Sequence, residues 1–206
     1  TDIQEIYDNG VDVFFNLENF IWLMKDLDII PECYIDTNIV EFLLNNTENK
    51  TDGVNHQKGC NTVVNNIQKN KQTCNGFALG VIDSDKRQPS YIKEFKEIGH
   101  SEHIKLMKKK TKNHFFIMIE PAMDTLILSC AAEVGVNMED YELASELKDF
   151  TKITKDVDSK KDTRFKRLFK DIKGSKEFVL FGNLLSYLKN HKYDYDEKEL
   201  KDYFDI

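Results

Sequence analysis

The sequence predicts an α/β fold, in which a mostly parallel sheet with flanking helices is followed by a helical C-terminal extension. Two runs, residues 77–82 and 114–119, are almost wholly apolar, which is typical of parallel strands buried on both faces. Stretches with helical periodicity alternate with these runs, as they do in α/β proteins. The length of 206 residues, with 40% hydrophobic and 32% charged residues, suits one core of ordinary size rather than two full domains.

The N-terminal part combines a helix with the first expected strand. Residues 16–30 place their apolar side chains on one helical face, and Pro31 ends that helix. Residues 33–38 predict a short strand that leads directly into a helical stretch, residues 39–46. We therefore expect a helical segment over residues 1–31, ahead of the sheet.

The middle of the chain contains the clearest strand. A polar passage at residues 45–59 predicts a surface loop, and residues 61–70 predict a helix with an apolar inward face. The strand at residues 77–82 then ends on an Asp-Ser-Asp sequence at positions 83–85. Residues 91–99 predict a short amphipathic helix or a turn.

A second strong strand follows. Residues 105–112 form a basic approach to it, and the strand at residues 114–119 ends at Glu120. Residues 123–134 predict an apolar helix, which Gly135 ends.

Beyond Asp140 the alternation of strands and helices gives way to helical sequence. Residues 178–188 have helical spacing, and residues 193–206 form a charged amphipathic tail. We therefore expect an α/β core over residues 32–140 and a helical extension over residues 141–206, which is not an independent domain.

Composition and charge exclude several classes of protein. The formal net charge is −7, with 12 acidic and 3 basic residues in residues 1–58 but 24 and 26 in residues 59–206. This acidity argues against a protein that coats nucleic acid by charge alone. No apolar run reaches the roughly 18 residues of a membrane-spanning helix, so we expect no membrane contact. The four cysteines are scattered without a C-x-x-C pair, which favours reduced thiols in a cytoplasmic protein.

Acidic residues follow each of the three expected strands. The first strand ends at Asp36, the second at Asp83 and Asp85, and the third at Glu120, with Asp124 one turn into the next helix. The carboxyl ends of parallel strands meet at one edge of a sheet, so these carboxylates are expected to converge. Such a cluster repels itself unless a cation lies within it, and oxygen ligands of this kind suit Mg²⁺ or Mn²⁺.

A structural role is the alternative for each acid taken singly. Aspartates are common at strand ends because they form local turns and cap the next helix. Taken together, at the same end of successive strands, they favour a metal site. Such a site would serve phosphoryl chemistry, because the ion neutralises charge and activates water.

The pattern of strand, acid and helix, followed by a strand that ends in IDSD, resembles a Toprim domain. Toprim domains are the metal-binding α/β modules of topoisomerases, primases and nucleases of the overcoming-lysogenization-defect type. The resemblance covers residues 32–135 and includes the sequences GVIDSDKRQ and IEPAMDTLIL. It implies Mg²⁺-dependent phosphodiester hydrolysis of DNA or RNA. Asp36, Asp83 and Asp85 would be catalytic and metal-binding, with Glu120 or Asp124 as a further ligand. The family has Glu-Gly in its first motif, where this chain has Asp36-Thr37.

A second stretch is similar to PIN-domain ribonucleases. YIDTNIVEFLL is close to the opening of such a domain, and MDTLILSCAAEVG resembles its later helix with an acid at the start. The sequence departs from that family at FALGVIDSD, where PIN domains are helical, and in the absence of a last acidic strand end after Gly135. Both resemblances imply an acid-clustered, Mg²⁺-dependent nuclease.

Two basic segments are candidates for contact with nucleic acid phosphates. One is the lysine-rich run at residues 105–112, and the other is residues 155–176, with nine Lys or Arg against four Asp. Phe165 and Phe169 lie within the second segment and either stack on bases or pack inward. The residues selected as candidates for nucleic-acid binding are Lys109, Lys110, Arg164 and Arg167.

Two functions follow from these patterns. The first is a metal-dependent nuclease that works on DNA or RNA, with a protein partner such as an ATPase to hold its substrate. The second is a non-catalytic binding or regulatory module on the same scaffold, because Asp36 replaces the longer glutamate of the Toprim motif.

Overall fold

The computed structural model describes residues 28–45, 54–69, 76–84 and 88–205. None of the described helices is long and apolar enough to cross a lipid bilayer. The strands are β1 (Ile29–Pro31), β2 (Ala78–Asp83), β3 (Phe95–His100), β4 (Ile104–Lys109) and β5 (His114–Ile119). The α-helices are α3 (Tyr34–Asn45), α4 (Cys60–Lys69), α5 (Met123–Glu133), α6 (Leu147–Thr154), α7 (Thr163–Ile172), α8 (Lys176–Asn190) and α9 (Glu197–Asp202). Three short 3₁₀ helices are η1 (Ser90–Glu94), η2 (Met138–Tyr141) and η3 (Val157–Lys160).

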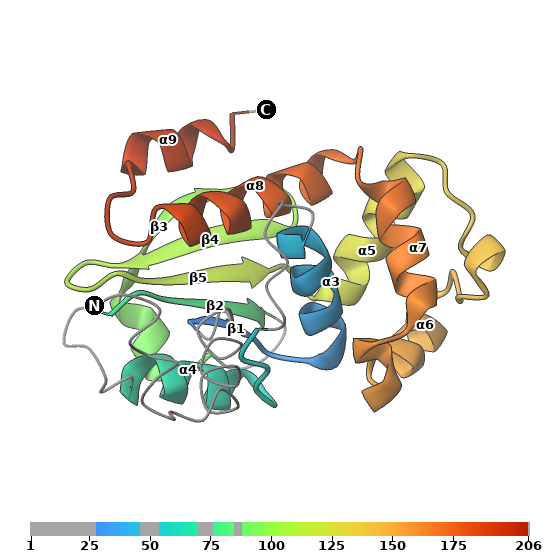
Figure 1. Cartoon of the computed structure of the whole chain (residues 1–206), viewed down its shortest axis with the longest axis horizontal. Helices are drawn as coiled ribbons and strands as arrows, with labels where there is room; N and C mark the ends of the chain where they lie inside the picture. The colour runs from blue at the N-terminus through green and yellow to red at the C-terminus, as the bar shows by residue number, and fades with distance from the viewer. Residues whose placement is uncertain (1–27, 46–53, 70–75, 85–87, 206) are drawn as a thin grey trace, which may run out of the picture.

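Within the described residues the strands form one mixed sheet in the order β1-β2-β5-β4-β3 (Figure 1). Strands β1, β2 and β5 are parallel, and Asp83 at the end of β2 lies opposite Ile119 at the end of β5. Strands β3 and β4 form an antiparallel hairpin that pairs with β5 through β4. The α/β class is thus confirmed, whereas the prediction of a mostly parallel sheet is corrected to a sheet that is only partly parallel.

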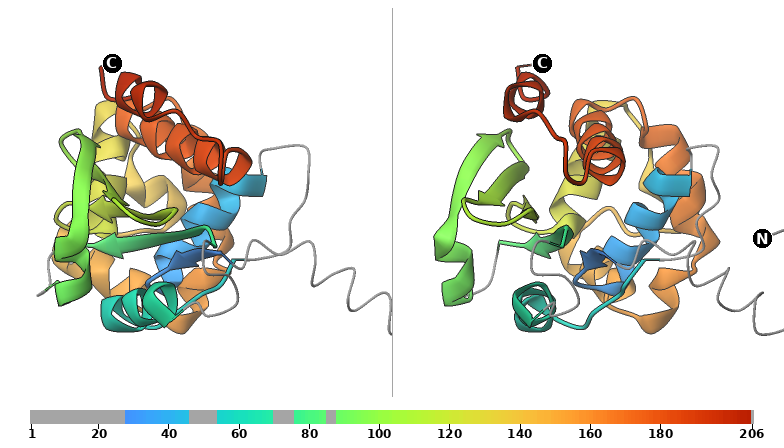
Figure 2. Two further views of the ribbon diagram at one scale, coloured as in Figure 1. Left: turned by 90° about the vertical axis from the view of Figure 1, so that its left-hand side faces the viewer. Right: turned by 60° about the vertical axis from the view of Figure 1, so that its left-hand side comes forward.

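Helices cover both faces of the sheet, which explains the two apolar runs. Helix α4 and η1 pack on one face, and α3, α5 and α8 pack on the other (Figure 2). Successive side chains of a strand point to opposite faces. In β2, Leu79 and Val81 accordingly belong to one apolar cluster, and Ala78 and Ile82 belong to the other.

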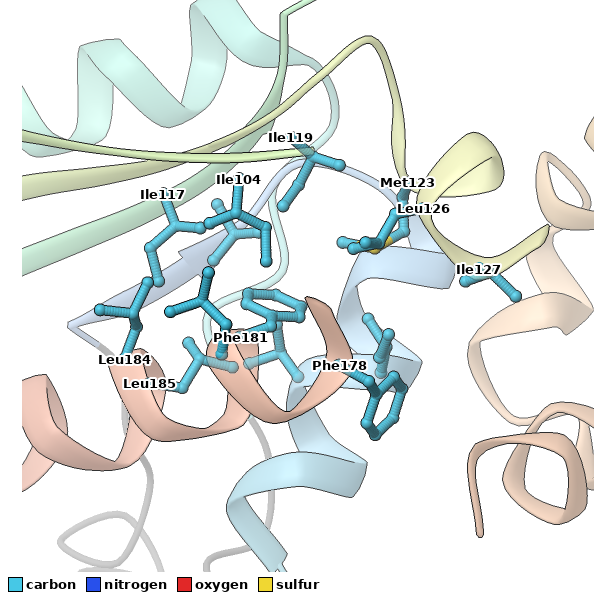
Figure 3. Packing of buried hydrophobic residues seen from close by; sticks show 14 of the residues in the cluster. Ile104, Ile117, Ile119, Met123, Leu126, Ile127, Phe178, Phe181, Leu184 and Leu185 are labelled. Atoms are coloured by element: carbon cyan, nitrogen blue, oxygen red, sulfur yellow. The ribbon is translucent and has the colours of Figure 1, made fainter. Parts of the chain in front are cut away.

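The larger apolar cluster joins the sheet to the C-terminal helices. Ile117 and Ile119 of β5 belong to this cluster together with apolar side chains of α5 and α8. Figure 3 shows these side chains, including Phe181 of α8. Phe165 and Phe169 of α7 are fully buried in the same cluster. The two phenylalanines therefore pack inward rather than presenting their rings to a base.

The first strand lies earlier in the sequence than predicted. Asp36 Oδ2 accepts a hydrogen bond from the main-chain N–H of Cys33 over 3.1 Å, and the Thr37 hydroxyl donates to the Cys33 carbonyl over 2.8 Å. These bonds fold the chain back on Cys33 and cap a helix that begins at Tyr34. The predicted strand at residues 33–38 is therefore wrong.

The first strand is instead β1, which ends at Pro31. Its residues Ile29 and Ile30 pair in parallel with β2. The predicted helix over residues 16–30 is wrong at its last two residues. Its remaining residues, except Asp28, lie outside the described part of the chain.

The hairpin of β3 and β4 replaces two segments that were not expected to be strands. Residues 91–99 contain the end of η1 and most of β3, rather than only a helix or a turn. Residues 104–109 form β4, in which Ile104 and Leu106 are fully buried and Lys105 is half-buried. This alternation has the period of a strand, and the lysines on the other face concealed it.

A candidate acidic site at the carboxyl end of the sheet

A cavity of about 250 Å³ lies at the carboxyl ends of β1 and β2, beside the first turns of α3 and α5. The end of β2 and the start of α5 are close together in Figure 1. The first turn of a helix has unpaired N–H groups and favours negative charge. The charged and titratable side chains of the lining belong to Glu32, Cys33, Tyr34, His56, Lys58, Asp83, Asp124 and Lys155.

Asp83 joins three segments of the chain at this cavity. Its Oδ1 atom accepts a hydrogen bond from the main-chain N–H of Met123 over 3.0 Å and so caps the start of α5. Its own main-chain N–H donates to Glu32 Oε2 over 3.2 Å. The ends of β1 and β2 and the start of α5 are held together in this way.

Glu32 is a member of the site that the sequence interpretation missed. It directly follows β1, lines the cavity and is only 2% exposed. The expectation that an acid follows the first strand was correct, but the strand was placed too late, at Asp36. The β-branched pair Ile29 and Ile30 ahead of Pro31 was the signal that could have placed it.

Asp36 is fully buried in the first turn of α3. Its Oδ2 atom caps the helix, whereas its buried Oδ1 atom has no hydrogen-bond partner in the described part of the chain. Burial raises the pKa of Asp36 to about 7, although hydrogen bonds from Cys33 oppose the shift, and the nearby charges of Glu32 and Asp124 raise it further. Asp36 is thus a buried residue near Glu32 and Asp124, which line the cavity.

Asp124 lies in the first turn of α5 and lines the cavity. Its Oδ2 atom accepts a hydrogen bond from the Thr151 hydroxyl over 2.7 Å. The carboxylate therefore also anchors α6 to the start of α5.

One predicted ligand does not join this group, and another cannot be placed. Glu120 forms an ion pair with Lys105, with 2.7 Å between Oε1 and Nζ, and it is not part of the cavity lining. Asp85 lies outside the described residues. The structure therefore brings Asp36, Asp83 and Asp124 together with Glu32, and it places Glu120 elsewhere.

The predicted nucleic-acid-binding lysines lie at the other end of the sheet. Lys109 ends β4, and its neighbour Lys108 pairs with Phe115 at the start of β5. The Lys109 ammonium group pairs with Glu94 and lies 4.1 Å from the centre of the Tyr91 ring. Lys110 is exposed in the following turn.

The two predicted arginines lie at the start and in the middle of α7. The Arg164 guanidinium group binds the Asp162 carboxylate, with 2.7 Å between Nη2 and Oδ2, and it also donates to the Glu142 carbonyl. Arg167 is exposed and lies 5.9 Å from the centre of the Tyr141 ring. Neither of them lines the cavity, where Lys58 and Lys155 supply the positive charges instead.

The donor atoms of the site are carboxylate oxygens, which suit a hard divalent cation. Across the described ranges, which omit Asp85, no three His, Cys, Asp or Glu side chains are already arranged as ligands of one ion. The oxygen of Asp36 that lacks a partner and the nearness of Glu32 and Asp124 to that carboxyl group are the features of this site that fit such a cation.

Comparisons of the chain with protein-family models, with curated proteins and with solved structures found no match. The resemblances to Toprim and PIN domains therefore remain hypotheses, and the function has to be argued from the site.

Proposed function

We propose that the protein hydrolyses phosphodiester bonds of nucleic acid, DNA or RNA, with the help of Mg²⁺ or Mn²⁺. The observation that carries this proposal is the meeting of Glu32, Asp83 and Asp124 at one cavity, with the buried carboxyl group of Asp36 behind them. The charges of Glu32 and Asp124 raise the pKa of Asp36, and a divalent cation would relieve this repulsion.

Within this proposal the four acids, with Asp85 as a further predicted ligand, would hold the ion. A bound divalent ion neutralises phosphate charge and lowers the pKa of the water that attacks phosphorus. Lys58 and Lys155, which line the same cavity, supply positive charge for a phosphate of the substrate. A Toprim-like and a PIN-like relationship both fit this chemistry, and the antiparallel hairpin of β3 and β4 is a departure from a wholly parallel sheet.

A non-catalytic module on the same scaffold is the second candidate. It is favoured by the structural work that each acid already does: Asp36 caps α3, Asp83 caps α5 and Asp124 holds Thr151 of α6. These hydrogen bonds need no cation, so the carboxylates could serve the stability of the fold alone.

Calorimetry with Mn²⁺ and cleavage of labelled DNA and RNA test the proposal. Asp83→Asn keeps the oxygen that caps α5 but removes the charge. Glu102→Gln, the control, removes an exposed carboxylate that is not part of the cavity lining. We expect binding heat and cleavage in the wild type and in Glu102→Gln, and neither in Asp83→Asn. A folded wild type that gives no binding heat and no cleavage would overturn the proposal of a nuclease. If that protein still bound nucleic acid, the non-catalytic binding module would be established instead.

A further inference from the structure

His56 is held in place at the rim of the acidic cavity. The main-chain N–H groups of Asn55 and Gln57 donate to the carbonyls of Ile29 and Pro31, over 3.0 and 3.1 Å, along the edge of β1 that β2 does not occupy. The residue between them is fixed by these two bonds, and its imidazole ring lines the cavity together with the acids. The ring is therefore placed by the sheet rather than by a free loop.

A hydrogen bond to Thr37 determines which nitrogen of His56 carries a proton. The Thr37 hydroxyl oxygen lies 2.8 Å from the Cys33 carbonyl oxygen, and two oxygens this close need a hydrogen between them. Only the hydroxyl can supply that hydrogen, so it cannot also donate to His56 Nδ1, which lies 2.7 Å away. His56 Nδ1 therefore donates to Thr37, and in the neutral ring Nε2 has the free electron pair.

The surroundings of the imidazole favour its neutral form. The ring stacks on Tyr34, with 4.8 Å between the ring centres and an angle of 17° between the planes. Burial and the charge of Lys160 lower the pKa of His56, and the Cys33 carbonyl opposes this shift. The other charged groups around the cavity are Glu32, Lys58, Asp83, Asp124 and Lys155.

We propose that His56 is a catalytic base of the hydrolysis, taking up the proton of the attacking water at its Nε2 atom. This inference rests on the proposed function and adds a residue to it. Thr37 is a positioning residue in this scheme, because its hydroxyl holds Nδ1 and leaves Nε2 as the proton acceptor.

The step balances without any further reactant. The water oxygen forms a bond to phosphorus while one of its O–H bonds breaks, and the proton moves to His56 Nε2. The bond from phosphorus to the leaving sugar oxygen breaks with its electron pair on that oxygen, which takes a proton from solvent. The imidazolium then returns its proton to solvent, and the site is restored.

Cleavage rates measured against pH test the role of His56. We expect His56→Gln to lose roughly 100-fold or more in kcat/KM, as general bases do, while Mn²⁺ binding is kept. At saturating Mn²⁺, log kcat/KM of the wild type should fall at acid pH, because the His56 ring takes up a proton and can no longer act as the base; in His56→Gln this fall should be absent. His100→Gln, an exposed histidine bonded to Glu97, should match the wild type. A His56→Gln enzyme that keeps its rate, or that loses rate but keeps the wild-type fall at acid pH, overturns the proposal.

Nitrogen NMR of the histidines gives a readout that does not need activity. We expect His56 to carry its proton at Nδ1 in the wild type and to lose that preference in Thr37→Val, which removes the acceptor. A proton found at Nε2 in the wild type overturns the inference even if the protein cleaves nucleic acid. A wild type that does not cleave overturns the nuclease itself, so the two failures are distinguishable.

Discussion

The carboxylate of Asp83 and the main-chain N–H of Met123 are joined by a hydrogen bond of 3.0 Å that links the end of β2 to the start of α5. A residue at the centre of the candidate site thus also caps a helix. Removal of its charge and removal of its oxygen are therefore different experiments, and the two variants Asp83→Asn and Asp83→Ala separate them.

Asp83→Ala should lower the free energy of unfolding by about 1 kcal/mol relative to Asp83→Asn. Alanine leaves the N–H of Met123 without its acceptor, whereas asparagine still offers a side-chain oxygen. Urea unfolding in a metal-free buffer measures the difference. Equal stabilities of the two variants would show that the cap contributes nothing.

Asn38→Ala should destabilise the protein by roughly 1–3 kcal/mol. The buried Asn38 side chain donates to the Ser159 carbonyl over 2.7 Å and ties α3 to η3, so alanine leaves that buried carbonyl unpaired. The matched control is Asn65→Ala at an exposed position of α4, which should be neutral or slightly stabilising. Unfolding curves in urea that coincide for both variants would contradict the role of Asn38.

The sequence predicts well those strands and helices in which burial alone determines the order of apolar and polar residues. Strands β2 and β5 and helix α5 were located to within one or two residues, because each is a long apolar run between polar ends. Strand β1 was missed because it has only three residues and ends in Pro31. Strand β4 was missed because its lysines resemble a basic surface segment.

The candidate site could be predicted only where it lies on those well-predicted elements. Asp83 and Asp124 could be predicted because they lie at the end of β2 and in the first turn of α5. Glu32 depends on where β1 ends, and His56 depends on main-chain pairing with that strand, so neither was accessible without the correct first strand. The geometry of the cavity is a tertiary property that no local pattern encodes.

The His114 ring should remain neutral at pH values well below those at which a histidine usually takes up a proton. Burial, followed by the charges of Lys112 and Lys109, lowers its pKa to about 4, and its Nδ1 atom lies 2.9 Å from the Tyr91 hydroxyl. NMR titration of the His114 ring should show a midpoint near that value, and Lys112→Gln should raise the midpoint by removing one positive charge. A midpoint near 6.5 in the wild type would contradict this prediction.

Asp36 should make the protein less stable as the pH rises from about 4 to 7. Its folded-state pKa of about 7 lies above the unfolded value near 3.9, so in this window the unfolded chain has lost a proton that the folded chain keeps. The stabilisation is complete below pH 4 and is lost as the pH rises through 7, by an amount on the order of 4 kcal/mol.

Asp36→Asn isolates this contribution, because it keeps an oxygen for the Cys33 N–H and cannot ionise. The unfolding free energy of the wild type minus that of Asp36→Asn should fall across the window in metal-free buffer. Two parallel stability curves would show that Asp36 has an ordinary pKa in the folded protein.

Thermal melts with and without Mn²⁺ provide the last prediction. If the acids share a cation, Mn²⁺ at a hundred times its dissociation constant adds about 2.7 kcal/mol of stability, or roughly 5–10 °C in Tm. Asp83→Asn should melt slightly higher than the wild type without metal, because one repulsive charge is gone, and should show no shift with Mn²⁺. Glu102→Gln, whose carboxylate is exposed and outside the cavity lining, should shift as the wild type does. Parallel shifts in the wild type and in Asp83→Asn would contradict the metal site, because an acid that only caps α5 affects both conditions equally.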